Sequence, residues 1–172
     1  MTAQTLIENT VAPSEQNRLA ARRWIDAFNT RDDAAEAASR TADYVAHAPE
    51  SIEARPLEGD AWVDFLGVFL EGFPDLQVEV QSSSADEHMV AQRILFTGTN
   101  TGSFRGLPPT GRRVSFSGLE LNRMVDGQVA EHWVQMDALT LFAQLGLRVV
   151  PGPRLLLRII ASPFRKLSRK ER

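Results

Sequence analysis

The sequence predicts an α+β domain in which a curved antiparallel sheet wraps around helices near the N-terminus. Apolar residues recur at helical spacing up to Pro74, and beyond it they alternate with polar residues along consecutive segments. Asp126-Gly127 separates the last two alternating segments and is a strong signal for a tight hairpin turn. Helices followed by consecutive strands bury their apolar sides by packing as layers, which gives the α+β class.

The helical part follows a leader, residues 1–13, that we expect to be flexible. Ser14 is the expected N-cap of the first helix, because its hydroxyl can accept from an otherwise unpaired backbone N–H. The next apolar residues fall at i, i+3, i+4 and i+7, as on one face of a helix: Ala21, Trp24, Ile25 and Phe28. A short alanine-rich helix is predicted at about 34–41.

A short strand at 44–47, ended by Pro49, and a third helix complete this half of the chain. The third helix is predicted to start at Gly59-Asp60 and to end before Pro74. Its apolar residues form one wide aromatic face: Trp62, Phe65, Leu66, Phe69 and Phe73.

Four long antiparallel strands are predicted in the second half. The first alternates from Leu76, and the others span about 89–99, 113–125 and 128–136, with a glycine- and proline-rich loop at 102–111. A short helix is expected at 138–145, with Gly146 as its C-cap.

Composition narrows the class of protein. The 172 residues fit one domain, placed at 14–146, with an extension at 147–172. Because there is no cysteine, a disulfide scaffold, a thiolate metal site and a cysteine nucleophile are excluded. No secretory signal pattern or long apolar run is present, so a soluble, cytoplasmic protein is expected.

The charges are distributed unevenly. Residues 147–172 hold eight of the 19 basic residues and one of the 22 acidic ones, a charge of +7, which leaves −10 on the preceding 146 residues. An acidic body argues against nucleic-acid binding. The extension, with its apolar run at 155–161, is expected to pack as a terminal helix on the domain or across a dimer. The alternative is a weak membrane-surface contact through residues 153–172.

Three segments carry a resemblance to a known family. They are Gly72 to Val80, Gly98 to Arg112 (with Gly-Thr-x-x-Gly and Pro-Pro-Thr-Gly-Arg), and Asp126 to Asp137 (with Glu-His-Trp-x-x-x-Asp). In this order they resemble the SnoaL-like polyketide (ester) cyclases, over about residues 15–146. The resemblance implies an NTF2-like cone with a deep apolar pocket, a homodimer and no cofactor.

The resemblance also implies a catalytic group. In well-known members an aspartate is the general acid/base for aldol ring closure of an aromatic polyketide ester, and Asp137 is the matching position. A histidine near the start of the hairpin assists in some members. In this chain Arg123 is the matching position, and arginine cannot give up its proton near pH 7.

The residues themselves leave alternatives open. If the strand face of Trp133, Gln135 and Asp137 lines the cone, desolvation would raise the pKa of Asp137 and suit it to acid/base chemistry. The alternative is that Asp137 is the N-cap of the following helix. His132 belongs to the opposite face and is expected to serve packing or an interface rather than catalysis.

Two further side chains are candidates. His47 either faces the cavity mouth or is a turn residue at a strand end. Arg123 either points into the pocket, where it needs an anionic partner, or is a solvated charge. Contacts to substrate are expected from Trp133, Gln135, Trp62, Phe69 and Phe28. The three histidines show no metal-ligand spacing, so no metal is expected.

The sequence therefore predicts a cofactor-independent polyketide cyclase, or a related isomerase or lyase, with Asp137, His47 and Arg123 as catalytic residues. One alternative keeps the pocket for epoxide hydrolysis or cyclisation, or for an accessory role in hydroxylation. Another is a non-catalytic, dimeric module that binds a small molecule, since fold does not fix function.

Overall fold

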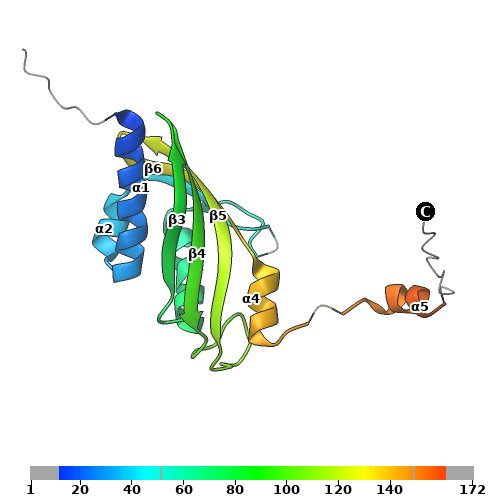
Figure 1. Ribbon diagram of the computed structural model, residues 1–172. Helices are drawn as coiled ribbons and strands as arrows, with labels where there is room; N and C mark the ends of the chain where they lie inside the picture. Colours follow the sequence, from blue (N-terminus) through cyan, green and yellow to red (C-terminus); the bar gives the residue numbers. More distant parts are fainter. Residues whose placement is uncertain (1–11, 51, 149, 162–172) are drawn as a thin grey trace, which may run out of the picture.

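The computed structural model describes residues 12–50, 52–148 and 150–161, with side chains up to residue 158 (Figure 1). It confirms the predicted α+β class. The elements in chain order are α1 (Pro13–Thr30), α2 (Asp33–Ala38), β1 (Arg40–His47), β2 (Leu57–Glu58), α3 (Asp60–Gly72), β3 (Gln77–Ala85), β4 (Met89–Thr99), β5 (Arg113–Val125), β6 (Gln128–Met136), α4 (Ala138–Leu145) and α5 (Pro153–Ala161).

The strands form one six-stranded sheet in the order β2-β1-β6-β5-β4-β3. The four long strands β3 to β6 pair antiparallel, as predicted. At the other side, β1 pairs parallel to β6 and antiparallel to the two-residue strand β2, which the sequence did not predict. The sheet is curved and open, and α1 and α2 lie along one side of it (Figure 1). No helix in the described ranges is both long and apolar enough to cross a membrane.

The first helix begins earlier than expected. Ala12 is its N-cap and makes no side-chain hydrogen bond there, so the predicted Ser14 cap is wrong. Pro13 occupies the first turn, where its missing N–H would have no helical partner in any case. The predicted leader, residues 1–13, otherwise lies outside the described residues.

The hairpin is as predicted, and it fixes which residues face each other. Asp126 and Gly127 both have positive φ, 48° and 76°, as a type I′ turn requires. The register then pairs Asn122 with His132 across β5 and β6. A bulge lies between Arg123 and the next residue of β5.

Alternate residues of β5 face the interior of the domain. The even-numbered ones, from Val114 through Met124, are buried or glycine, whereas Leu119, Leu121 and Val125 are exposed. On β6, Val129 and Ala130 are buried next to the bulge, and His132 and Val134 follow on the inner face. The outer face of the sheet therefore carries exposed leucines, and the inner face carries buried polar residues.

Asn100 explains why the glycine and proline motifs occur together. Its side chain is 1% exposed and donates to the carbonyls of Gly72 and Gly102, at 3.1 and 3.0 Å. Its Oδ1 accepts from the backbone N–H and the hydroxyl of Thr110, at 2.8 and 2.9 Å. At Gly102 a Cβ would lie 1.9 Å from the carbonyl oxygen of Glu71, so only glycine fits. These motifs serve the fold.

Candidate functional site

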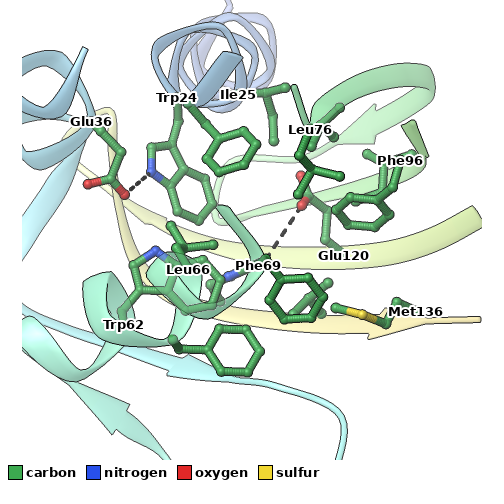
Figure 2. Close-up of a pocket in the computed structure, with 16 residues that line it drawn as sticks. Trp24, Ile25, Glu36, Trp62, Leu66, Phe69, Leu76, Phe96, Glu120 and Met136 are labelled. Atoms are coloured by element: carbon green, nitrogen blue, oxygen red, sulfur yellow. Dashed lines mark hydrogen bonds and ion pairs between the residues drawn. The ribbon is translucent and has the colours of Figure 1, made fainter. Parts of the chain in front are cut away.

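A cavity lies between the inner face of the sheet and helices α1 and α3 (Figure 2). Its walls are mostly aromatic and aliphatic, and its polar side chains are Glu36, Glu120 and His132 together with the Trp24 and Trp62 indoles. The remaining lining residues are Ile25, Phe28, Phe65, Leu66, Phe69, Leu76, Val78, Ile94, Phe96, Val134 and Met136. An apolar cavity with a few converging polar groups is the usual form of a small-molecule site.

The cavity has a buried end and a partly exposed end. Among its lining residues, Phe28, Leu66, Phe96 and Met136 are half-buried, whereas the three polar side chains are buried. The cavity volume is about 60 Å³, which is small beside the roughly 300–1,000 Å³ of typical ligand pockets. A larger ligand would therefore enter by moving the half-buried side chains.

Glu120 and His132 form a charged or hydrogen-bonding pair at the buried end. Glu120 is 5% exposed and His132 is 2% exposed, and Glu120 Oε2 lies 3.5 Å from His132 Nε2. This distance is long for a hydrogen bond, so the two groups are in polar contact without a close hydrogen bond. Both residues face inwards because they are even-numbered positions of the neighbouring strands β5 and β6.

Several buried polar atoms around this pair have no hydrogen-bond partner within the described part of the chain. They are Glu120 Oε1, His132 Nε2, Gln92 Oε1 and both polar atoms of the Asn122 amide. The four residues are adjacent on the inner face, since Gln92 pairs with Glu120 and Asn122 pairs with His132. An unsatisfied buried polar group costs about 1–3 kcal/mol, so a cluster of them points to a ligand-binding role.

The imidazole of His132 is held by aromatic residues. The rings of Trp24 and Trp62 meet it edge-on, with centroids at 4.9 and 5.2 Å. The hydroxyl of Tyr44 lies 3.3 Å from His132 Nδ1. Burial raises the pKa of Tyr44, so its hydroxyl keeps its proton and can donate to Nδ1. That hydrogen bond would leave Nε2 with the proton, directed at Glu120.

Glu36 fixes another part of the wall. It accepts from the Trp24 indole N–H at 2.9 Å (Figure 2), and its other carboxylate oxygen accepts from Arg40 at 2.8 Å. Both partners of the Arg40 ion pair are largely buried. Glu36 is therefore fully engaged and positions Trp24, whereas Glu120 keeps one carboxylate oxygen free.

Asp137 does not line this cavity. It is the N-cap of α4, where Oδ1 accepts from the Thr140 backbone N–H at 2.9 Å and Oδ2 from the Thr140 hydroxyl at 2.6 Å. These two hydrogen bonds, with the hydroxyl the stronger cause, lower the pKa of Asp137. The expected desolvated environment and raised pKa are wrong, because odd-numbered positions at the end of β6 face outwards. Its catalytic role stays a prediction.

His47 and Arg123 are brought together, but on the outer face of the sheet. Glu131 lies between them and accepts from His47 Nε2 at 2.9 Å and from Arg123 at 3.2 Å. The hydrogen bond from His47 is the main cause that lowers the pKa of Glu131, and Arg123 adds to it. His47 also stacks on Trp133, with ring centroids 5.2 Å apart. Neither side chain lines the cavity, so the placement of Arg123 in the pocket is wrong.

The predicted substrate contacts divide between the two faces. Trp62, Phe69 and Phe28 line the cavity, as expected. Trp133 and Gln135 instead line an open groove on the outer face, next to Leu119 and Leu121. The expectation that Trp133 and Gln135 face the cone is wrong for the same reason of strand parity.

Glu120 is not among the site residues predicted from the sequence, and His132 is predicted there to serve packing or an interface rather than a site. A signal was present: Val114 and Phe116 are apolar and Ser115 and Ser117 are polar, so the even positions of β5 face inwards. Because a strand keeps its parity, Glu120 must face inwards too. In the described ranges, no group of three or more acidic or histidine side chains is placed to hold a metal ion.

The chain is similar to a curated protein and to several solved structures. Among curated proteins, DauD, an aklanonic acid methyl ester cyclase from Streptomyces sp. strain C5, is 29% identical over 73% of this chain and 78% of its own. The crystal structure of AclR, a proposed hydroxylase from Streptomyces galilaeus, is 34% identical, with TM-score 0.69, over 77% of this chain and 97% of its own.

IdmH from Streptomyces antibioticus, a proposed polyketide cyclase, has a crystal structure that is 30% identical, with TM-score 0.71, over 77% of this chain and 99% of its own. The family of SnoaL-like polyketide cyclases matches residues 18–145, most of the domain described above. The fold, the cavity and these matches agree, and the chain belongs to the SnoaL-like polyketide cyclase family.

Proposed function

We propose that this protein is a cofactor-independent cyclase that closes a ring of a polyketide-like substrate by intramolecular aldol chemistry, with Glu120 as the general acid/base. The observation that carries the proposal is the buried carboxylate of Glu120, which lines the cavity with one oxygen unpaired beside His132. A buried carboxylate without a partner is costly to the fold, and a proton-bearing substrate atom would supply that partner.

The reaction follows from this placement. Glu120 Oε1 takes a proton from a carbon next to a substrate carbonyl, and the enolate carbon attacks a second carbonyl of the same molecule. A carbon–carbon bond forms, and the alkoxide that results takes the proton back from Glu120. Substrate and product are isomers, so the step needs no oxidant or reductant. His132 holds Glu120 Oε2, and its N–H stabilises the negative charge that moves between carboxylate and substrate.

The walls suit a flat aromatic substrate. Trp62, Phe65 and Phe69 follow one another along α3 with ring centroids 5.6 and 5.3 Å apart, and they would pack against an aromatic ring system. The half-buried Phe28, Leu66, Phe96 and Met136 would open to admit it. We infer an aromatic polyketide ester as the substrate class, on the model of the DauD reaction.

Turnover of aklanonic acid methyl ester, followed by chromatography and mass spectrometry, tests the proposal. The wild-type chain is expected to give a product of unchanged mass. Glu120→Gln should lower kcat by about 10²- to 10⁴-fold, the usual contribution of a general acid/base. Asp137→Asn, which keeps an N-cap, should retain most of the activity. If Asp137→Asn is inactive and Glu120→Gln is active, Asp137 is the acid/base after all. Binding without turnover would favour the non-catalytic module.

A second candidate is an accessory role in hydroxylation, which the 34% identity to AclR favours. The same mass measurement separates cyclisation from hydroxylation, because hydroxylation adds one oxygen atom to the product and cyclisation adds none.

The homodimer and the cytoplasmic location stay predictions. Light scattering of the full chain tests the dimer, for which the exposed outer face around Leu119, Leu121 and Trp133 is our candidate interface.

A further inference from the structure

Within the described part of the chain, nothing covers the leucine side chains of helix α5, so the helix does not pack on the domain, which was one of its two expected arrangements. It begins at Pro153, after Pro151-Gly152, and Figure 1 shows it apart from the sheet and the other helices. Leu155, Leu156 and Leu157 are all exposed. Three consecutive leucines in water are unfavourable, because each exposes a large apolar surface.

The two sides of α5 differ in chemistry. Arg154 and Arg158 are four residues apart, so they lie on the same side of the helix. Leu156 is two residues from each of them and therefore lies on nearly the opposite side. Leu155 and Leu157 lie at the two flanks between these sides, since successive residues are about 100° apart around a helix. A helix with cations on one side and leucines opposite and at the flanks suits a boundary between water and hydrocarbon.

The distribution of charge along the chain favours an anionic surface as the binding partner of α5. The extension of residues 147–172 carries +7 and the rest of the chain carries −10. An anionic surface would attract the extension and repel the body. The exposed segment around Pro151 and Gly152 separates the two. A length of nine residues, or about 13.5 Å of helix, is too short to cross a bilayer but long enough to lie on one.

We propose that α5 binds the surface of an anionic membrane, with Leu155, Leu156 and Leu157 at the acyl boundary and Arg154 and Arg158 on lipid phosphates. The basic residues that follow in the sequence, from Arg165 to Arg172, add to the electrostatic attraction. This function is separate from the chemistry in the cavity. It would hold the protein where apolar aromatic compounds collect.

Co-flotation of the full chain with vesicles tests the proposal. The vesicles contain equal parts of phosphatidylglycerol and phosphatidylcholine, or phosphatidylcholine alone. We expect binding to the first kind only, and weaker binding at high salt, because salt screens the attraction. Arg154→Glu/Arg158→Glu should lower the partition coefficient at least tenfold, since each basic residue near an anionic surface contributes roughly fivefold. Leu156→Asp should also weaken binding.

A matched control is Arg55→Glu/Arg113→Glu, which changes the net charge by the same amount on exposed residues of the body. It should bind as the wild type does. If the control loses as much vesicle binding as the α5 variant, binding depends only on the net charge of the protein, and the proposal is overturned. The proposal would also be overturned if the wild-type chain floats with neither kind of vesicle. Self-association that the α5 variants abolish, without lipid binding, would identify a second copy of the chain as the partner instead.

Discussion

Replacing the Glu120–His132 pair by apolar residues should stabilise the fold while it removes activity. The pair is buried, its two closest polar atoms are 3.5 Å apart, and each residue has an unpaired polar atom. Replacing such a pair by leucines is often stabilising, by about 1–4 kcal/mol. In Glu120→Leu/His132→Leu the Tyr44 hydroxyl also loses its partner, at a cost of about 1 kcal/mol. The double variant should therefore be at least as stable as the wild type, by about 0–3 kcal/mol.

The single variant should behave in the opposite way. His132→Leu leaves the Glu120 carboxylate buried and unpaired, so the free energy of unfolding should fall by about 3–5 kcal/mol. Urea unfolding at neutral pH, followed by the fluorescence of Trp24 and Trp62 beside His132, measures both variants. If the double variant is as destabilised as the single one, the pair serves the fold, and our reasoning that it is kept for chemistry is refuted.

Three other predictions follow from the contacts described above. Asn100→Ala removes a side chain with four buried or half-buried hydrogen bonds, so the free energy of unfolding should fall by about 3 kcal/mol, measured by urea unfolding. The hydrogen bonds from Thr140 lower the pKa of Asp137, so its ionised carboxylate stabilises α4 above about pH 4. This stabilisation is lost as the pH falls through the lowered pKa and the carboxylate takes up a proton. Asp137→Asn should therefore make thermal unfolding less sensitive to pH between about pH 2 and 5. Tyr44→Phe leaves His132 Nδ1 without its donor and should lower kcat by on the order of tenfold with little change in KM; an unchanged kcat would show that Tyr44 does not position His132.

The sequence predicted the elements well because each long element has a strong local signal. The alternation in β3 to β6, the Asp126-Gly127 turn and the Gly146 cap of α4 all appear as expected, and Gly146 has φ 100°. The signal fails at the first helix, where Pro13 starts the helix one residue before the expected Ser14 cap. It also fails at β2, which has only two residues and therefore no period.

The site was harder to predict because burial and polarity disagree along β5. Leu119, Leu121 and Val125 look like an inner face, yet they are exposed, while Glu120 and Asn122 are buried. Judging the second half of the strand by hydrophobicity alone therefore inverts its two faces. The same inversion underlies the expectation that Trp133 and Gln135 line the cone, whereas the catalytic role of Asp137 was implied by the family resemblance. Natural sequences break a local rule of this kind most often where function requires it.

The outer cluster of His47, Arg123 and Glu131 shows why proximity alone does not define the active site. Glu131 contacts both His47 and Arg123, and Trp133 stacks on His47. The cluster nevertheless lies on an open face of the sheet, where water screens its charges. The buried pair lies among aromatic rings, where electrostatic interactions are stronger.

The most direct test of the account is a crystal structure of the full chain with an aromatic polyketide ester bound. We predict that the ring system lies between α3 and the inner face of the sheet, with an enolisable carbon or a hydroxyl of the ligand next to Glu120 Oε1. A ligand bound instead in the outer groove beside Trp133, with the cavity between α1, α3 and the sheet unchanged, would contradict the assignment of Glu120 and His132 as the reacting groups.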